Sequence, residues 1–460
     1  MRQPRGDTSE TVPHEFRVSP ALGFFLFVVC TGVLFVRPTD LIESLSDARL
    51  YELSIIGCFA ASAPLVRRQL AKEALLKNPI TMCVVGLLAA VALSHLSHFA
   101  IADAAASTFN FFKPVLSFLL MVGVVNTAAR LQKFLVWLFV FILTVAVLAL
   151  LQHHEIIDNP ALAAVRENIY DKATGSIIGF DMRLCAAGIF ANPNDLARIL
   201  VVGIGLSLYF FDGGRPGMFK PFWLGSAGVF FYALTLTLSR GGLIGLFVTL
   251  LVISYFRVGA RLTALAAVLA LPALALVGGS RQTDLSTSEG TGQQRVQLWS
   301  DGFVAMKSSP LFGIGLGKYP ELTNGLGAHN SFVEAYVEVG FFGGTLFLGA
   351  VVCALAMGFS VCRTRSQLAH PILERTGPYL LAILAGYSAG MLSSSRYYMI
   401  PTYLLLALVV IHLRLATANA WLPKFRVTPR FALRFVAFSA FAVVALQLFI
   451  VTSVRFSSGD

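Results

Sequence analysis

The chain has 460 residues, of which 56% are hydrophobic and 13% are charged, and its mean hydropathy is +0.75. Soluble domains are less apolar than this, so the composition excludes them and predicts an integral membrane protein. The formal net charge of +11 does not indicate a nucleic-acid partner, because most of the cations fall in loops where membrane topology explains them.

Apolar runs long enough to cross a bilayer, about 17 to 25 residues each, recur along nearly the whole chain. We therefore expect an all-α polytopic membrane protein with about 12 to 13 transmembrane helices in one membrane domain, residues 1–460. No small-residue cleavage site follows the first run, so we expect an uncleaved span there and no signal peptide. In chain order the runs are 20–36, 50–66, 80–99, 108–126, 133–152, 195–212, 221–239, 241–257, 261–278, 337–361, 378–394, 398–416 and 432–451.

The Lys and Arg residues predict the orientation, because short loops rich in these residues stay in the cytoplasm. If the N-terminus is inside, the cytoplasmic segments hold most of the 35 Lys and Arg residues. Among them are Arg67, Arg68, Lys72, Lys77 and Arg414. The same register places two long polar segments outside, 153–194 and 279–336, and the second leads into the C-terminal transmembrane helices of 337–460. Function is expected where polar residues meet the bilayer, so these two segments are the candidates.

Two arginines lie at the outer ends of expected spans before the second outer segment. Arg183 belongs to "GFDMRLCAAGIFANPNDLAR", just before the Asn-Pro-Asn turn that begins the sixth span. Arg240 belongs to "TLTLSRGGLIG", where only "SRGG" connects two apolar runs, so its guanidinium is held at the outer membrane boundary. Each arginine either anchors its span by contacting lipid phosphate or serves a binding site, and both interpretations stay open.

The second outer segment contains a third arginine and a histidine. Arg295 lies in "EGTGQQRVQLWSDGF", where the spacing of Val296, Trp299 and Phe303 predicts an amphipathic helix on the membrane interface. His329 closes this segment. A lone histidine in a loop is more often a satisfied polar residue than a catalytic one, so its surroundings decide its role.

The residues after His329 predict a helix start. Ser331 and Glu334 have the spacing of a capping box, which predicts a helix from Ser331 onward. His329 then precedes a helix N-terminus, whose positive dipole end disfavours imidazolium and leaves the ring able to accept a proton near pH 7. Glu338 lies one turn beyond Glu334 on the same face, and we interpret it as structural or as a supporting residue of the site.

Several other chemistries are poorly represented. The segment "GIGLGKYP" resembles a phosphate-binding loop but lacks the first Gly and the final Ser or Thr that such a loop needs. We find no tandem repeat, no zinc-type Cys or His motif and no acidic pair spaced for a divalent metal, so no cofactor is expected. A transporter remains an alternative, although transporters keep their polar residues near the midplane and here they cluster at outer span ends.

The segment "HNSFVEAYVEVGFFG" carries a family resemblance. His329 and Asn330 are followed by nine residues, Gly340, two residues and Gly343, which resembles the histidine signature of bacterial O-antigen ligases. Upstream, "GIFANPND", "SRGGLIG" and "GQQRVQLW" with "SPLFGIGLGKYP" resemble, in the same order, segments of the wider ligase and polymerase superfamily. The similarity covers roughly residues 180 to 344, and it implies a GT-C-like glycosyltransferase architecture. O-antigen ligases usually have twelve spans, against the thirteen apolar runs counted here.

The resemblance implies glycosyl transfer on the periplasmic side of the bacterial inner membrane. The donor would be a polysaccharide on undecaprenyl diphosphate, and the acceptor a sugar hydroxyl of lipid A-core. Arg240, Arg295 and Arg183 would stabilise the leaving diphosphate, since a guanidinium binds phosphate through two parallel hydrogen bonds. His329 would be the general base, supported by Asn330 and Glu338. Direct attack on the anomeric carbon would invert its configuration, without a metal.

Two enzymes of the same superfamily remain alternatives. An O-antigen polymerase would use a second diphosphate-linked glycan as acceptor and would not need lipid A-core. An O-linked oligosaccharyltransferase would transfer the glycan to protein and often carries an outer domain near its C-terminus. Only about nine residues follow the last expected span here, so we do not expect such a domain.

Overall fold

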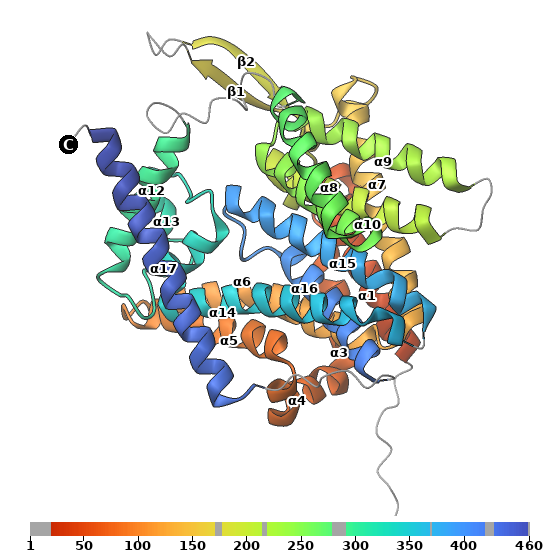
Figure 1. The fold of residues 1–460 in the computed structure, drawn as a ribbon, viewed down its shortest axis with the longest axis horizontal. Coiled ribbons are helices and arrows are strands. Elements are labelled where there is room, and N and C mark those ends of the chain that lie inside the picture. Colours follow the sequence, from red (N-terminus) through yellow and green to blue (C-terminus); the bar gives the residue numbers. More distant parts are fainter. Residues whose placement is uncertain are drawn as a thin grey trace, which may run out of the picture.

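The apolar runs of the sequence form long helices, as expected where the backbone N–H and C=O groups have no water to bond and must pair within the segment. The computed structural model describes residues 20–170, 177–213, 219–277, 291–368, 370–418 and 427–458. Residues 279–290, the beginning of the second expected outer segment, lie outside the described residues. Figure 1 shows the described chain as a helical bundle that carries one small β-hairpin.

The helices follow the expected runs closely. The α-helices are α1 (Pro20–Val36), α2 (Pro38–Leu41), α3 (Leu50–Gln69), α4 (Lys72–Lys77), α5 (Pro79–Leu96), α6 (Ile101–Val124), α7 (Ala128–His153), α8 (Pro193–Gly213), α9 (Phe219–Leu236), α10 (Arg240–Val277), α12 (Thr291–Met306), α13 (Tyr319–Leu322), α14 (Ser331–Arg363), α15 (Pro371–Gly390), α16 (Ile400–Ala418) and α17 (Pro429–Ser458). The short 3₁₀ helices are η1 (Glu43–Leu45), η2 (Pro160–Leu162), η3 (Gly188–Phe190), η4 (Arg365–Gln367) and η5 (Met391–Ser393).

The prediction of an all-α polytopic membrane protein is confirmed. Within the described residues, 10 helices are long and apolar enough to cross a membrane. They do not include α9 and α15, which coincide with two of the expected runs, and α10 is counted once although it covers two runs. Gly259 lies between these two runs with a φ of 84°, which breaks the helical geometry of α10 at that point.

A two-stranded hairpin in the first outer segment was not anticipated. Strands β1 (Val165–Tyr170) and β2 (Ile177–Arg183) pair antiparallel, with Val165 opposite Arg183. The Arg166 guanidinium lies 4.0 Å from the centre of the Phe180 ring, a cation–π contact between the strands. Pairing places Arg183 at the base of the hairpin, where β2 enters the turn that leads to α8.

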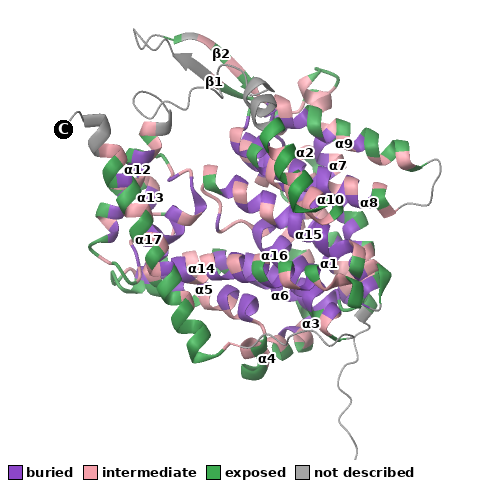
Figure 2. Ribbon diagram, viewed as in Figure 1, coloured by how far each residue is buried: buried purple, intermediate pink, exposed green. Residues whose placement is uncertain are grey.

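Helix α14 lies in the centre of the bundle and connects its two ends. It packs on α5, α15 and α16, and these central helices are largely buried in Figure 2, whereas α17 is exposed along most of its length. The hydroxyl of Ser439 in α17 lies 2.7 Å from the Tyr336 hydroxyl and 2.6 Å from the Thr345 hydroxyl, which holds α17 against α14.

The end of the bundle that contains His329 is built from helix ends and loops. Figure 1 shows α12, α13 and the beginning of α14 together, with the C-terminal end of α17 beside α12. Val296 and Phe303 of α12 are buried in a small apolar cluster that includes Ile450 of α17. A helix around Arg295 is therefore present as predicted, with its apolar residues packed on protein, and its position on the membrane interface stays a prediction. The C-terminal end of α17 lies at the same end of the bundle as His329.

Candidate active site

The loop before α14 holds His329 in a constrained position. Its φ of 49° is in the left-handed region, and its backbone N–H donates to Ser395 Oγ at 2.8 Å. Trp299 Nε1 of α12 donates to the carbonyl oxygen of the preceding Ala328 at 2.7 Å. The backbone around His329 is therefore fixed from two sides, by α12 and by the loop after η5.

The imidazole of His329 is half-buried beside positive charges. Burial lowers its pKa below the ordinary value of 6.5, and the charges of Arg295 and Arg396 lower it further. A lowered pKa means that the ring is neutral at pH 7 and able to accept a proton. Its ring nitrogens have no hydrogen-bond partner in the part of the chain that the structure describes, so they are available to a substrate.

Arg295 is half-buried in α12 and lies among other arginines. Burial lowers the pKa of its guanidinium, and the positive charges of Arg240 and Arg183 lower it further. Among the described residues, no side chain or carbonyl forms a hydrogen bond or ion pair with this guanidinium. A cation that is partly desolvated, repelled by its neighbours and unmatched by the described residues is suited to bind an anion.

Arg183, in contrast, is committed to protein partners. Its Nη1 donates to Glu167 of β1 at 2.8 Å, its Nη2 donates to Asn194 Oδ1 at 3.1 Å, and its Nε donates to the Thr237 carbonyl at 2.9 Å. The guanidinium therefore ties β1, the beginning of α8 and the end of α9 together. Its positive charge still acts on the site, because it lowers the pKa of Arg295.

Arg240 is the first residue of α10, and the preceding Ser239 belongs to the same network. Ser239 Oγ, next to it, donates to Asn194 Oδ1 at 2.8 Å and accepts the Gly242 N–H at 3.2 Å, so it links Asn194 to the first turn of α10. Gly241 is required by close packing, since a Cβ at that position would collide with Ser393 Oγ. The "SRGG" connection thus brings the α9–α10 turn against η5.

Glu338 is an internal anchor of the site. Its side chain is 1% exposed, with one carboxylate oxygen accepting the Tyr319 N–H at 3.2 Å and the other accepting the Tyr397 hydroxyl at 3.0 Å. Its backbone carbonyl accepts the Gly315 N–H at 2.9 Å. The carboxylate is fully occupied by protein donors, which supports the structural interpretation of Glu338.

The glycine of the histidine signature permits a backbone crossing. Gly340 has a φ of 69° and interrupts α14, and a Cβ there would collide with backbone atoms of Leu311 and Gly313. Gly313 also has a positive φ, 75°. Because both positions are glycine, the loop that contains Gly313 approaches α14 this closely. Tyr319, farther along the same segment, then bonds to the carboxylate of Glu338.

The expected capping box at the start of α14 is wrong in its details. The helix begins at Ser331 as predicted, but Asn330 is the N-cap, and its Oδ1 accepts the N–H groups of Phe332 at 3.0 Å and Val333 at 3.3 Å. Ser331 instead donates from Oγ to the Ser394 carbonyl at 2.5 Å. Because the Ser331 hydroxyl bonds to the η5–α16 loop, the side chain of the neighbouring Asn330 caps the helix instead.

Arg396, in the loop between η5 and α16, is a site residue that was not predicted. Its backbone N–H donates to Ser331 Oγ at 3.0 Å, and its Nε donates to Asp195 of α8 at 2.6 Å. Burial lowers the pKa of its guanidinium, but the Asp195 carboxylate outweighs burial, so the pKa is raised overall. The sequence signal resembles that of Arg240: an arginine in a short outer connection between two apolar runs.

Behind Arg396 lies a buried group of charges. Asp195 pairs with both Arg396 and Arg198, and Arg198 lies 5.0 Å from the centre of the Tyr387 ring. Glu334 of α14 is 3% exposed, and the positive charges of Arg396 and Arg198 act on its carboxylate. Among the described residues, Glu334 Oε2 and two nitrogens of Arg198 have no hydrogen-bond partner. This group connects α8, α14 and the Arg396 loop beneath His329.

The structure brings the predicted residues together. Arg183, Arg240, Arg295 and the additional Arg396 form what we term the arginine cluster, connected through their effects on Arg295 and His329. Asn330 caps α14 next to His329, and Glu338 bonds to Tyr319 and Tyr397. Within the described part of the chain, no group of three or more His, Cys, Asp or Glu residues is placed to hold a metal ion.

Comparison with known proteins finds a match for the segment that carries His329 and two of the four arginines of the cluster. A family model described as O-antigen ligase matches residues 225–348, which contain Arg240, Arg295 and His329 but neither Arg183 nor Arg396. No curated protein matches the chain. The predicted resemblance to the O-antigen ligase and polymerase superfamily is thereby confirmed, at the level of the superfamily.

Proposed function

From the match of residues 225–348 to the O-antigen ligase family, we propose that this protein is an O-antigen ligase. It transfers a polysaccharide from undecaprenyl diphosphate to a sugar hydroxyl of lipid A-core, at the periplasmic face of the bacterial inner membrane. The observation that carries the proposal is the position of Arg295: a half-buried guanidinium, unmatched by the described residues, beside a neutral and available His329.

The donor's diphosphate is the anion that the arginine cluster binds. A polyprenyl diphosphate keeps its tail in the bilayer and its headgroup at the boundary, where the ends of α10 and α12 bring Arg240 and Arg295. Charge-assisted hydrogen bonds from a planar guanidinium match two phosphate oxygens at once. Binding the diphosphate would also relieve the repulsion that lowers the pKa of Arg295.

The transfer step uses His329 as general base. A hydroxyl oxygen of the acceptor attacks the anomeric carbon of the donor sugar, and its proton passes to the neutral imidazole of His329. The bond between the anomeric carbon and the phosphate oxygen breaks, and its electron pair leaves with undecaprenyl diphosphate. The arginine cluster stabilises the charge that develops on the leaving group. The anomeric configuration is inverted.

Arg183 and Arg396 act in different ways from Arg295. The three guanidinium nitrogens of Arg183 donate hydrogen bonds to Glu167, Asn194 and Thr237. Arg183 therefore positions the turn that carries Arg240, and its positive charge acts on the site from a distance. Arg396 positions the beginning of α14 through its backbone N–H to Ser331. We assign both as positioning residues of the site.

The test is transfer in vitro with purified components. The protein in lipid nanodiscs is given an undecaprenyl diphosphate-linked glycan and one of three acceptors: lipid A-core, lipid A without core sugars, or a second lipid-linked glycan. We expect product only with lipid A-core. Longer lipid-linked chains without lipid A-core would identify a polymerase, and glycosylation of an added acceptor protein would identify an oligosaccharyltransferase. Movement of the donor across the bilayer without product would identify a transporter.

A further inference from the structure

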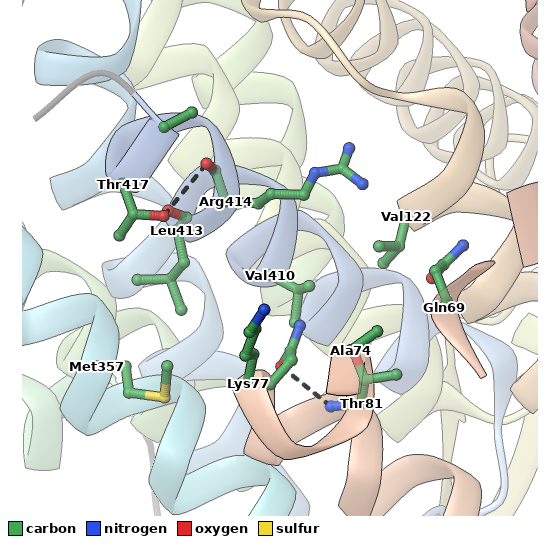
Figure 3. A pocket seen from close by; sticks show the side chains of 12 residues that line it. Gln69, Ala74, Lys77, Thr81, Val122, Met357, Val410, Leu413, Arg414 and Thr417 are labelled. Atoms are coloured by element: carbon green, nitrogen blue, oxygen red, sulfur yellow. Dashed lines mark hydrogen bonds between the residues drawn. The ribbon is translucent and has the colours of Figure 1, made fainter. Parts of the chain in front are cut away.

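A second candidate site lies at the opposite end of the bundle from His329. A cavity of about 700 Å³ lies between the ends of α3, α4, α6, α14 and α16 and the beginning of α5, close to the last turns of α14 (Figure 3). This volume falls in the range of small-molecule sites. None of its lining residues belongs to the arginine cluster, so it is separate from the candidate active site.

One wall of the cavity is apolar. It consists of Val122 of α6, Met357 of α14, and Val410 and Leu413 of α16. A wall of unbranched and branched aliphatic side chains is suited to hydrocarbon, and it gains no specific hydrogen bond from a polar ligand. The apolar wall therefore indicates a ligand with a lipid chain.

Two cations line the same cavity. Lys77 is exposed at the end of α4, where its Nζ lies 3.8 Å from Glu73, and Arg414 lies on the last turns of α16. Arg414 Nη2 donates to the Val125 carbonyl at 3.0 Å, which holds its side chain across the ends of α6 and α16. Figure 3 shows Lys77 and Arg414 among the side chains that line the cavity.

Two polar atoms at the cavity lack a partner in the described part of the chain. Thr81 is 3% exposed and its Oγ1 forms no hydrogen bond with the described residues, and the same holds for Oε1 of Gln69. A buried polar atom without a partner costs free energy, so these two atoms indicate a ligand with polar groups. The Thr81 hydroxyl is able to donate to a phosphate oxygen, and Gln69 Oε1 is able to accept from a ligand hydroxyl.

The position of the cavity completes the description of the ligand. Lys77 and Arg414 belong to the cations that are expected on the cytoplasmic side, where the phosphates of anionic lipids gather. We propose that this cavity binds an anionic phospholipid with a hydroxylated headgroup, namely phosphatidylglycerol. Its phosphate lies between Lys77 and Arg414, its headgroup hydroxyls reach Gln69, and one acyl chain follows the apolar wall.

The test measures lipid binding to the purified full-length protein in neutral detergent by native mass spectrometry. We expect phosphatidylglycerol to stay bound where phosphatidylethanolamine of the same chain length dissociates. The double variant Lys77→Gln/Arg414→Gln should bind phosphatidylglycerol roughly 30-fold more weakly, the loss expected for two cations that face one phosphate. The matched control is Arg68→Gln/Lys72→Gln, which removes two exposed cations that do not line the cavity and should change binding less than about threefold.

Further variants keep the proposal testable if the double variant folds poorly. Ala74→Phe narrows the cavity without changing charge and should also weaken phosphatidylglycerol binding, and Lys77→Gln alone should show part of the effect. Equal binding of phosphatidylethanolamine, equal weakening by the control pair, or unchanged binding in Ala74→Phe would each overturn the proposal. Binding of inorganic phosphate as tight as that of phosphatidylglycerol would also overturn it, because the apolar wall would then contribute nothing.

Discussion

The two ends of the bundle both carry many cations, but they hold them differently. At the end with His329, Arg295 is partly buried, and the charges of Arg240 and Arg183 add to burial in lowering its pKa. At the opposite end, Arg67, Arg68 and Lys72 are exposed at helix ends, where water screens them. Membrane topology explains the second arrangement but not the first.

The difference shows that positive charge is energetically unfavourable at the His329 end of the bundle. Burying like charges near one another is unfavourable, so a protein keeps such an arrangement only where an anion is bound or where the strain serves a function. Exposed cations at a membrane boundary contribute orientation and little else to the fold. Substitutions at the His329 end should therefore lower glycosyl transfer, whereas matched substitutions at the opposite end should not.

The largest effect is expected from His329→Ala. Loss of a general base lowers transfer by about 10²- to 10⁴-fold. The measurement is product formed per inserted protein, with His370→Ala as control, because His370 is an exposed histidine before α15 at the opposite end. Near-normal transfer by a correctly inserted His329→Ala protein would remove this residue from the mechanism.

Replacement of the phosphate-binding arginines by lysine should have the next largest effect. Arg240→Lys and Arg295→Lys keep the charge but lose the planar fork, so each should lower transfer roughly 10- to 100-fold at saturating donor. Arg67→Lys preserves the orientation signal and should leave transfer unchanged. If both site variants work as well as Arg67→Lys, these arginines are interfacial anchors and the diphosphate is held elsewhere.

Glu338→Gln separates a structural role from a chemical one within the His329 end. Glutamine keeps one acceptor for Tyr319 or Tyr397 but not both, so the free energy of unfolding should fall by about 1–3 kcal/mol. Transfer per folded protein at a permissive temperature should fall less than about tenfold. Glu321→Gln, which removes an exposed carboxylate, serves as control. A loss as large as that of His329→Ala would make Glu338 a chemical participant.

The pH dependence of transfer should reflect the surroundings of His329. Its lowered pKa keeps the imidazole neutral below pH 6.5, so transfer is lost only as the pH falls through that lowered value. Arg295→Gln removes one neighbouring positive charge and should raise the pKa of His329, so the remaining activity should be lost at a higher pH. Arg67→Gln should cause no shift. If Arg295→Gln loses activity at the same low pH as the unaltered protein, the charge of Arg295 does not act on His329.

No change is expected on addition of excess EDTA. We assign the charge of the leaving diphosphate to the arginine cluster, so transfer should persist when divalent metals are chelated. The assay uses purified protein, lipid-linked glycan and lipid A-core, with and without EDTA. Loss of activity that Mg²⁺ or Mn²⁺ restores would show that a metal shares the work of the arginines.

Much of the fold was predictable because membrane helices are specified locally. A run such as 20–36 or 133–152 is apolar enough to span, and a helix is the structure that satisfies its backbone there. The helix around Arg295 was predictable from a different local signal, the helical spacing of Val296, Trp299 and Phe303. The hairpin β1–β2 was not, because its short strands are stabilised by pairing with each other and carry no strong local pattern.

The candidate residues were identified one at a time from unusual positions: arginines at outer span ends and a histidine before a helix start. These signals are local, and they apply equally to Arg396, which the same criterion would have selected. The capping box at Ser331 shows the limit of local inference. Ser331 has the right spacing to cap α14, but its hydroxyl bonds to Ser394 and Arg396, which come from a distant segment.

Only the tertiary structure decided which cations act together. Arg183 follows a hairpin, Arg240 begins α10, Arg295 lies in α12 and Arg396 follows η5, and nothing in the spacing of these segments predicts that they meet. They meet because α8, α10, α14 and α15 pack side by side and bring the outer ends of their helices together. The sequence by itself determined the spans and the side of the membrane on which each charge is expected, since both depend on local apolarity and charge. Salt screens the interaction between exposed charges over about 10 Å, so which arginines act on one another depended on how the helices pack.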